Sequence, residues 1–218
     1  MSQVKLTADS GGGTVSLKGP SSTTSNAAQI LTLPGTASGT VLTTTSPKSG
    51  SIIQVVSTPV DSTTDVSLNT RYSYYEITPL TTNITTTVAN SKILVTAGIS
   101  GEANHEDYNL AFRCGRVIGG SLTIIFRGAD ASSRTTCLGM GNTGYYDNDQ
   151  NSTTAYNSFA NMLDSPSQAS GTTITYKFFV SSLGGNNANY FLNRTVGNTD
   201  TQSHERTFSY LTLMEVAP

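Results

Sequence analysis

The two histidines of the chain, His105 and His204, are each followed directly by a glutamate. A metalloprotease motif of the His-Glu-x-x-His type needs a second histidine four residues after the first, so that two ring nitrogens can bind one zinc ion. Asn109 and Phe208 occupy those positions instead. We therefore predict that both histidines are solvated surface residues and that the chain holds no zinc site of this kind.

Three acidic residues, Glu102, Glu106 and Asp107, cluster around His105. Two carboxylates held about 5–9 Å apart can hydrolyse a glycosidic bond, one acting as the acid and the other as nucleophile or base. Here the carboxylates are expected in a polar loop without an aromatic platform close in sequence. The chain also lacks a Walker-type phosphate loop and a Gly-x-Ser-x-Gly nucleophile elbow. We predict that the protein is not an enzyme and needs no cofactor.

The spacing of Asp147, Asp149 and Asn151 matches the start of a calcium-binding loop. Such a loop continues with glycine at its sixth position and glutamate at its twelfth. Ser152 and Ser158 stand there in this chain. A turn rich in Asn and Asp explains the pattern better, so no metal ligand is predicted.

Residues 139–154 form a long segment rich in Asn, Asp and Gly that also contains Tyr145 and Tyr146. Long loops in compact domains are usually functional or mobile, and exposed aromatic rings stack on sugars or fill pockets of a partner. The alternative is that both rings pack onto the domain and pin the loop. Tyr145, Tyr146, Asp147 and Asp149 are the predicted binding residues.

The two cysteines, Cys114 and Cys137, are 23 residues apart. A disulfide forms only if the strands that carry them pair, and nothing in the sequence marks an oxidising compartment. Two small buried hydrophobic side chains are the preferred interpretation. No pair of histidines lies near enough in sequence to complete a zinc site.

The composition restricts the elements that can position these residues. Charged residues make up 12% of the 218, about half the usual share near 25%. The 35 Thr, 28 Ser, 16 Asn and 20 Gly account for nearly half the chain. A helical bundle needs more Glu and Lys, a disordered tail needs more charge, and a net charge of −2 argues against an electrostatic nucleic-acid binder. Abundant Thr with 10 Tyr and 7 Phe favours β-strands.

Apolar and polar residues alternate with the strand period of two in several segments, for example Ile174, Tyr176 and Phe178. We place strands near 51–57, 71–79, 91–98, 107–114, 121–127, 134–140, 155–162, 172–181, 188–193 and 206–216. In 155–162 the spacing of Phe159 and Met162 also fits a helical turn, and the strand is preferred. Strands that are apolar on both sides indicate burial in a sandwich or at a subunit contact. The predicted fold of residues 49–218 is an all-β, jelly-roll-like sandwich of about eight strands.

Residues 1–48 contain no Tyr, Phe, Trp or Cys. Short apolar pieces at 14–18, 29–33 and 40–44 are separated by turns of Gly and Pro. A segment with so few large hydrophobic residues cannot bury enough surface to fold alone. It must be disordered, lie along another protein or intertwine with copies of itself, and the regular strand-and-turn pattern favours the last two.

The chain begins without the apolar run of a signal peptide. No stretch approaches the 18 apolar residues of a membrane-spanning helix. We expect a protein that is made in the cytoplasm without a signal peptide and does not insert into a membrane.

Two parts of the chain resemble bacteriophage fibre-like virion proteins. The first comprises Val15–Pro20, Leu31–Gly35 and Gly39–Thr44, which resemble the short repeats near the start of tail-fibre proteins. The second comprises Ser51–Ser57, Ser91–Val95, Leu163–Pro166 and Leu211–Val216, which resemble a module of marine and cyanobacterial phages. The resemblance implies a virion protein that forms a homotrimer, with 1–48 as attachment arm and shaft and 49–218 as a knob that contacts a host glycan or protein.

The sequence departs from that family in having only about a dozen residues before the first repeat, where a tail-docking fibre has a longer adaptor. Attachment to the tail, to the capsid or to another fibre therefore stays open. A capsid decoration or head-fibre protein is the first alternative, and a calcium-dependent carbohydrate-binding module is the second. A depolymerase is the third, although no catalytic residues for it are recognisable.

Overall fold

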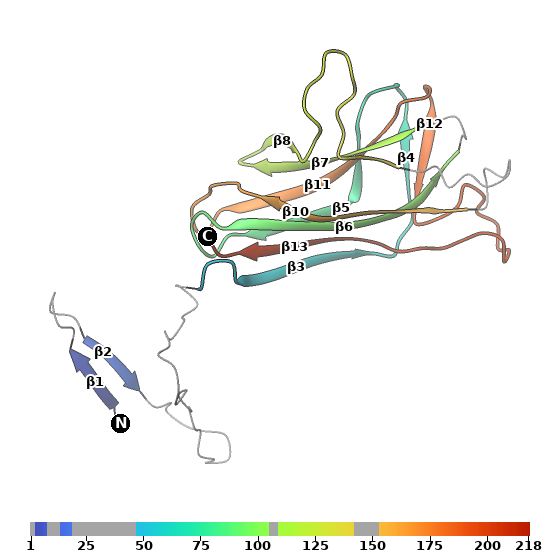
Figure 1. Cartoon of the computed structure of the whole chain (residues 1–218). Helices are drawn as coiled ribbons and strands as arrows, with labels where there is room; N and C mark the ends of the chain where they lie inside the picture. Colours follow the sequence, from blue (N-terminus) through green and yellow to red (C-terminus); the bar gives the residue numbers. More distant parts are fainter. Residues whose placement is uncertain (1–2, 8–13, 19–46, 105–108, 142–152) are drawn as a thin grey trace. The chain divides into compact units, whose positions relative to one another are not determined.

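The computed structural model describes residues 3–7, 14–18, 47–104, 109–141 and 153–218. The chain divides into two compact units, Met1–Val41 and Leu42–Pro218. In the first unit, β1 (Gln3–Thr7) pairs antiparallel with β2 (Thr14–Lys18) (Figure 1). The apolar piece at 14–18 is thus a strand, while the pieces at 29–33 and 40–44 lie outside the described residues. The functional division at residue 48 stays a prediction.

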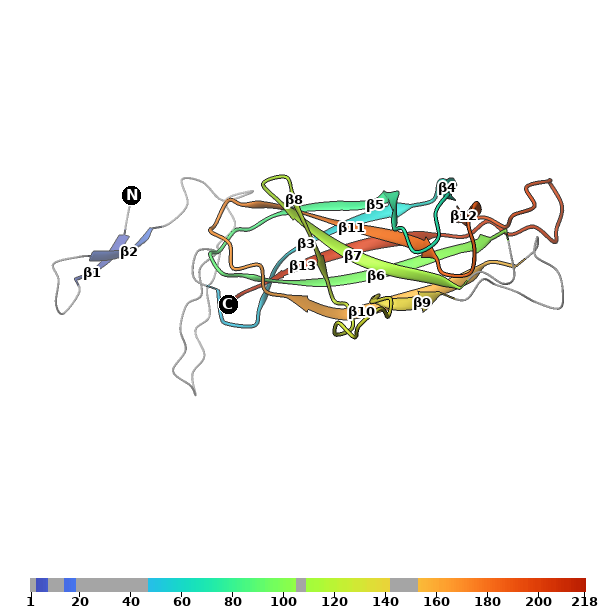
Figure 2. The same ribbon diagram turned by 90° about the horizontal axis from the view of Figure 1, so that it is seen from above.

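The second unit is a sandwich of two antiparallel sheets (Figures 1 and 2). The first sheet runs β3 (Ile52–Val60), β13 (Ser209–Val216), β6 (Lys92–Ala103), β12 (Ala188–Leu192), β4 (Thr64–Leu68), with β10 (Ala155–Asp164) also paired to β6. The second runs β5 (Tyr75–Thr85), β11 (Thr173–Ser182), β7 (Leu110–Ile118), β8 (Ser121–Ile125), with β9 (Gly139–Gly141) also paired to β7. The chain crosses repeatedly between the sheets, and the described residues contain no helix. The predicted all-β, jelly-roll-like sandwich is confirmed.

The hydrophobic core lies between the sheets, and alternate residues of the long strands face it. In β11, Ile174, Tyr176 and Phe178 are fully buried, as their period of two predicts. In β13, Leu211 and Leu213 are fully buried in the same way. Each such side chain contributes roughly 1.5–3 kcal/mol when it leaves water, so the alternation fixes which side of each strand faces inward.

Aromatic contacts fasten the two sheets together. Phe112 of β7 lies 5.7 Å from Phe159 of β10 and 5.8 Å from Tyr190 of β12, measured between ring centroids. Phe159 also lies 5.8 Å from Phe178. Aromatic pairs at such distances add about 0.5–1.5 kcal/mol each beyond the area that they bury. These four rings therefore join strands of both sheets.

A bulge in β10 explains why its sequence also fits a helical turn. The register with β6 shifts between Phe159 and Met162, and Asn161 within the bulge has a φ of 58°. The extra residues place Phe159 and Met162 on the same inner side although they are three apart in sequence. The strand prediction for this segment is confirmed, and the helix-like spacing comes from the bulge.

Three of the differences between the predicted strands and the structure have a clear local cause. β4 is absent from the predicted strands because it is short and only Val66 and Leu68 are buried in it. The strand predicted at 134–140 is wrong for most of its length, since only Gly139–Gly141 pairs with β7. The strand predicted from residue 71 begins at Tyr75, because Tyr72 has a φ of 67° and belongs to a turn.

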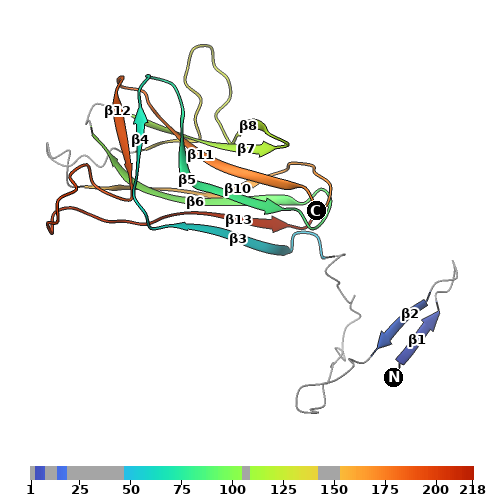
Figure 3. The same ribbon diagram turned by 180° about the vertical axis from the view of Figure 1, so that it is seen from behind.

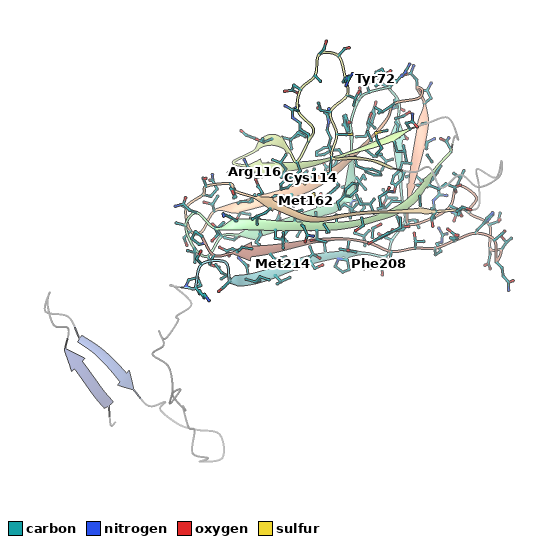
Figure 4. All side chains as sticks on the ribbon, viewed as in Figure 1. Tyr72, Cys114, Arg116, Met162, Phe208 and Met214 are labelled. Carbon is teal, nitrogen blue, oxygen red and sulfur yellow. The ribbon has the colours of Figure 1, made fainter. Side chains whose placement is uncertain are left out.

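Cys114 and Cys137 are both free thiols. Cys114 is fully buried between the sheets (Figure 4), where burial, and then the nearby charge of Asp164, raise the pKa of its thiol. Cys137 is partly buried, and its sulfur lies 3.8 Å from the sulfur of Met140. The prediction of a small buried hydrophobic residue is confirmed for Cys114 and is wrong for Cys137.

Candidate functional site

The four predicted binding residues, Tyr145, Tyr146, Asp147 and Asp149, lie outside the described residues. Residues 105–108, which include His105, Glu106 and Asp107, lie outside them as well. Their roles stay predictions. Within the described part of the chain, no three His, Cys, Asp or Glu side chains are grouped so that they could hold a metal ion, and no helix there is long and apolar enough to cross a membrane.

Glu102 is not in a polar loop, contrary to the expectation from sequence. It belongs to β6 and is almost fully buried, and its Oε2 accepts a 2.6 Å hydrogen bond from the amide of Val196. The expectation was wrong because β6 continues to Ala103, five residues beyond the predicted strand end.

His204 and Glu205 contact parts of the backbone that they hold in place. The Nδ1 of His204 lies 3.0 Å from the carbonyl oxygen and 2.9 Å from the hydroxyl of Thr199. Glu205 accepts a 2.6 Å hydrogen bond from the amide of Thr154 and a second from its hydroxyl. These contacts tie the segment before β13 to itself and to the residues that precede β10.

A buried charged cluster links the two sheets at the end of β10. Arg116 of β7 donates hydrogen bonds of 2.7 and 2.8 Å to the two carboxylate oxygens of Asp164. The hydroxyl of Tyr176 donates a 2.7 Å bond to the same carboxylate. Burial, and then the charge of Asp164, raise the pKa of Tyr176, so this phenol stays a donor. Figure 4 shows Arg116 between the layers, where the cluster acts as a cross-link.

The carboxylate of Glu215 is fully buried on the inner side of β13. It accepts hydrogen bonds from the amides of Thr87 (2.8 Å) and Val88 (3.1 Å), the Thr87 hydroxyl (2.9 Å) and Gln54 Nε2 (2.6 Å). Burial alone raises the pKa of Glu215, but the hydrogen bonds from Gln54, Ser91 and the two amides outweigh it and hold the pKa below its usual value. Glu215 therefore fastens the turn after β5 and the strand β3 to β13.

The outer side of β3, β13, β6 and β10, here called the aromatic face, is exposed and nearly free of charge. The side chains that point outward include those of Ile52, Val55, Ser57, Pro59, Tyr210, Thr212, Met214, Lys92, Leu94, Thr96, Tyr156, Ser158 and Leu163, with Phe208 just before β13. Lys92 is the one exposed charged residue of these four strands on this side, because Glu102, which shares its side of β6, is almost fully buried and accepts a hydrogen bond from the amide of Val196. Five of the eight large hydrophobic side chains exposed in the described residues lie here, namely Ile52, Val55, Tyr156, Leu163 and Phe208. Figure 4 shows Met214 and Phe208 along this side.

Aromatic rings from two strands close over a glycine near the middle of the aromatic face. A Cβ on Gly98 would lie 2.2 Å from the hydroxyl of Tyr156 and 2.5 Å from Cε1 of Tyr210. The two hydroxyls are 3.4 Å apart, and the ring of Phe208 stacks on that of Tyr210 with centroids 6.4 Å apart. The three rings form a strip across β10, β6 and β13, and the missing side chain at Gly98 lets them lie flat on the sheet.

A second surface surrounds the segment 127–138, which projects from the outer side of the other sheet between β8 and β9 (Figures 1 and 3). A hollow of about 440 Å³ on one side is lined by Tyr72, Arg113, Asp130, Ser132, Ser133, Arg134 and Thr135. A hollow of about 450 Å³ is lined by Leu122, Ile124 and Arg127. Arg113 and Thr136 line both. We call the two hollows together the loop groove.

The sequence indicates only one of these two surfaces. The alternation of Phe208, Tyr210 and Met214 places apolar side chains on both sides of β13, which is the signal for a contact surface. The loop groove has no comparable signal, because Tyr72, Arg113 and Arg134 belong to no motif and meet only through strand pairing.

No family model matches the chain, and a search of curated proteins finds no match. Three solved structures of infectious bursal disease virus are similar to it over part of their length. They are those of the Gx strain (TM-score 0.31, 12% identity, 94% of this chain and 44% of that one), the VP2 subviral particle (0.36, 14%, 88% and 47%) and the Gt strain (0.37, 12%, 94% and 49%). The chain thus spans less than half the length of each. At these scores the similarity decides neither fold nor function, and the sandwich rests on the strand pairing.

Proposed function

We propose that this chain is a structural protein of a virion and forms a homotrimeric fibre. In this proposal residues 1–48 attach the fibre to other virion proteins and form its shaft, and residues 49–218 form a knob that contacts the host surface. The resemblance of both segments to phage fibre-like proteins supports the proposal. The observation that carries it is the aromatic face, which we propose as the contact between copies of the knob.

The aromatic face has the chemistry of a surface that is covered in the assembled protein. Monomeric soluble proteins rarely expose contiguous apolar patches of several hundred Å². Because Lys92, at the start of β6, is the one exposed charged residue there, two copies can meet over most of the face without burying an unpaired ion, which would cost several kcal/mol. Like-charge repulsion, the usual obstacle to contact between identical surfaces, is also missing.

The size of the aromatic face suits an interface. Four strands about 4.8 Å apart, each with about eight residues of roughly 3.3 Å, cover about 500 Å² in projection. A pleated surface with side chains has more accessible area than its projection, so the face approaches the roughly 800 Å² that each partner buries in a standard interface.

The composition of residues 1–48 also favours association between copies. Without aromatic residues, this segment has little to bury within one chain. Three copies wound around one axis would supply each other's missing core, and their Thr and Ser side chains would hydrogen-bond across strands. Association would also cover strand edges that otherwise promote aggregation.

Host contact is assigned to the surfaces that trimer formation leaves free. The segment 139–154 with Tyr145 and Tyr146 keeps its predicted role in host contact. Replacing both tyrosines by alanine is expected to reduce adsorption to host cells while the trimer stays intact. Unchanged adsorption would remove this segment from the host contact.

The association is tested by light scattering on the full chain and on two matched variants. We expect the wild-type protein at micromolar concentration to have three times the chain mass of 22.9 kDa. Val55→Lys places a charge on the aromatic face and is expected to lower the association constant about 100-fold or more, because the charge is buried unpaired. Met140→Lys changes an equally exposed apolar residue of the other sheet and should leave the trimer intact. A wild-type monomer or dimer would contradict the trimer, and an intact trimer of the Val55→Lys variant would move the contact elsewhere.

A further inference from the structure

The loop groove is built around one arginine that is held rigidly in place. The guanidinium of Arg113 lies 3.7 Å from the centroid of the Tyr74 ring. Its Nε donates a 2.8 Å hydrogen bond to the carbonyl of Thr136, and its Nη2 lies 3.4 Å from the hydroxyl of Thr136. An arginine has five N–H donors. Thr136 accepts from two of them and the hydroxyl of Tyr74 accepts from Arg113 as well, so Arg113 keeps further N–H donors beside the two hollows that it lines.

Positive charge is concentrated around this arginine. Arg134 lines the first hollow, and Arg127 lines the second. The guanidinium of Arg71 lies 4.4 Å from the centroid of the Tyr72 ring, which lines the first hollow. The one carboxylate in the lining, that of Asp130, is paired with Arg127. In a chain of net charge −2, four arginines thus meet one acidic group here.

The ring of Tyr72 is presented to the groove by a turn in a rare conformation. Tyr72 is 52% exposed and has a φ of 67°, which bulky residues seldom adopt. Three hydrogen bonds hold the turn, from the amide of Tyr72 to Ser182 (2.9 Å), from the amide of Arg71 to Asn186 (2.7 Å) and from Arg71 Nε to Leu183 (2.8 Å). Strained backbone conformations of bulky residues tend to cluster at functional sites. Figure 4 shows Tyr72 beside the projecting segment.

We propose that the loop groove binds an acidic saccharide, with its carboxylate or sulfate group on Arg113 and Arg134. The flat, forked guanidinium matches a carboxylate or sulfate through paired hydrogen bonds. The ring of Tyr72 offers a surface on which a sugar ring can stack, and Ser132, Ser133 and Thr135 can exchange hydrogen bonds with sugar hydroxyls. This inference deepens the proposed host contact and rests on it only for the source of the ligand.

A saccharide fits the groove better than a nucleic acid does. A nucleic-acid site needs a continuous row of Lys and Arg along the phosphate backbone, and stacking of successive bases needs several exposed aromatic rings. Here hydroxyl groups separate the arginines, and Tyr72 is the one aromatic residue in the lining of the two hollows. The pattern suits a ligand with one or a few anionic groups among many hydroxyls.

The test measures calorimetric binding of the full-length protein to three polymers. We expect polygalacturonate and dextran sulfate to bind and neutral dextran not to bind. Comparing the affinities of the two acidic polymers shows whether the groove prefers a carboxylated or a sulfated sugar.

Arg134→Gln is the main variant, because the Arg134 side chain is exposed and bonds to none of the described residues, so folding should be unaffected. It should weaken binding about tenfold through the loss of a charge-assisted hydrogen bond. Arg113→Gln should have a larger effect. Lys92→Gln removes the same charge from the aromatic face and should change nothing.

Three results would overturn the inference: no binding of either acidic polymer, equal binding by Arg134→Gln, or tighter binding of a single-stranded DNA oligonucleotide. Failure of the groove and failure of the fibre are distinguishable. A trimer that adsorbs to host cells but binds neither acidic polymer would contradict only the saccharide site in the loop groove. A monomer that binds the acidic polymers through Arg134 would contradict the homotrimeric fibre and support the saccharide site.

Discussion

The two sheets of the sandwich share one construction on their outer sides and differ in charge. On each, a glycine in a central strand lies beneath side chains from its neighbours. Tyr156 and Tyr210 cover Gly98 on one sheet, and Leu122 and Phe179 cover Gly115 on the other. The first surface exposes a single charged residue, Lys92, at its margin. The second carries the ion pair between Lys177 and Glu76, with a 2.8 Å contact, and the arginines of the loop groove.

The difference shows how a chain with few charges can separate two kinds of contact. With 12% charged residues, the distribution of charge matters more than its amount. A surface without charge loses nothing by burial against its own copy, whereas a surface with unpaired arginines gains from meeting an anion. We therefore assign association to the aromatic face and ligand binding to the loop groove.

The largest expected effect comes from replacing Gly98 or Gly115, the two glycines that lie beneath neighbouring side chains, by valine. Gly98→Val would push the rings of Tyr156 and Tyr210 off the sheet, since a Cβ there lies 2.2 Å and 2.5 Å from their nearest atoms. We expect the trimer to dissociate at micromolar concentration in light scattering. Gly115→Val displaces Leu122 and Phe179, 2.7 Å and 2.8 Å away.

Both glycine variants should lose about 1–3 kcal/mol of folding free energy through overpacking, but Gly115→Val should remain a trimer. Equal loss of association in the two variants would break the assignment of the contact to one face. Denaturant unfolding of both variants provides the common scale, because it separates a general loss of stability from a specific loss of association.

The next largest effect should be a difference in salt dependence between ligand binding by the loop groove and association through the aromatic face. Screening weakens exposed charged contacts strongly between low and high ionic strength, so raising NaCl from 50 to 500 mM should weaken polygalacturonate binding about tenfold or more. The trimer should be unaffected, because its contact contains almost no charge. Calorimetry and light scattering on the same samples measure both. A trimer that dissociates with salt would show that charged groups carry the association.

The sandwich could be predicted from sequence because its main signal is local. The alternation of Ile174, Tyr176 and Phe178 identifies an inner side whatever strand lies opposite. β4 escaped prediction because a strand of five residues with two buried apolar side chains gives too short a pattern. The bulge in β10 gives part of its sequence a helix-like spacing, because the inserted residues interrupt the alternation of inward and outward side chains.

The loop groove could not be predicted, because no local pattern joins its residues. Tyr72 and Arg134 are 62 positions apart, and Arg113 lies between them in a different strand. The projecting segment follows from a left-handed residue, Phe126, whose φ of 53° ends β8 two residues before the predicted end. The aromatic residues that sequence favoured as a contact, Tyr145 and Tyr146, lie outside the described residues.

A smaller effect should distinguish the buried carboxylate of Glu215 in one sheet from the partly exposed carboxylate of Glu76 in the other, namely the loss of stability when each is replaced by glutamine. The folded-state pKa of Glu215 is lower than its usual value of 4.5. Its contribution to stability is therefore fully present above that pH and is lost as the pH falls through the folded pKa. Glu215→Gln should cost about 1–3 kcal/mol at pH 7, because an amide places donors where the carboxylate accepts.

The cost of Glu215→Gln should diminish as the pH drops below 4.5, because the carboxylate is protonated first in the unfolded chain and, at still lower pH, in the folded protein. Glu76→Gln, in the partly exposed ion pair of the other sheet, should cost no more than about 1 kcal/mol. Denaturant unfolding at pH 7 and at pH 3.5 measures both variants. A loss of stability from Glu76→Gln equal to that from Glu215→Gln would contradict the difference in burial on which the comparison rests.

The smallest effect is a titration shift that reports directly on burial of the aromatic face. The hydrogen bond with Tyr210, then burial and the charge of Tyr210, raise the pKa of Tyr156 above 10.0. Formation of the trimer would bury Tyr156 further, so its pKa should rise with protein concentration. The pKa of Tyr74, which burial raises and Arg113 lowers, should not change, because the loop groove stays free. Alkaline difference spectra at two protein concentrations, assigned with Tyr156→Phe and Tyr74→Phe, measure the pKa values of both tyrosines.

Tyr210→Phe should lower the Tyr156 pKa while changing the free energy of association by less than about 1 kcal/mol. A concentration-dependent shift of Tyr74 instead would place the contact between copies on the groove side.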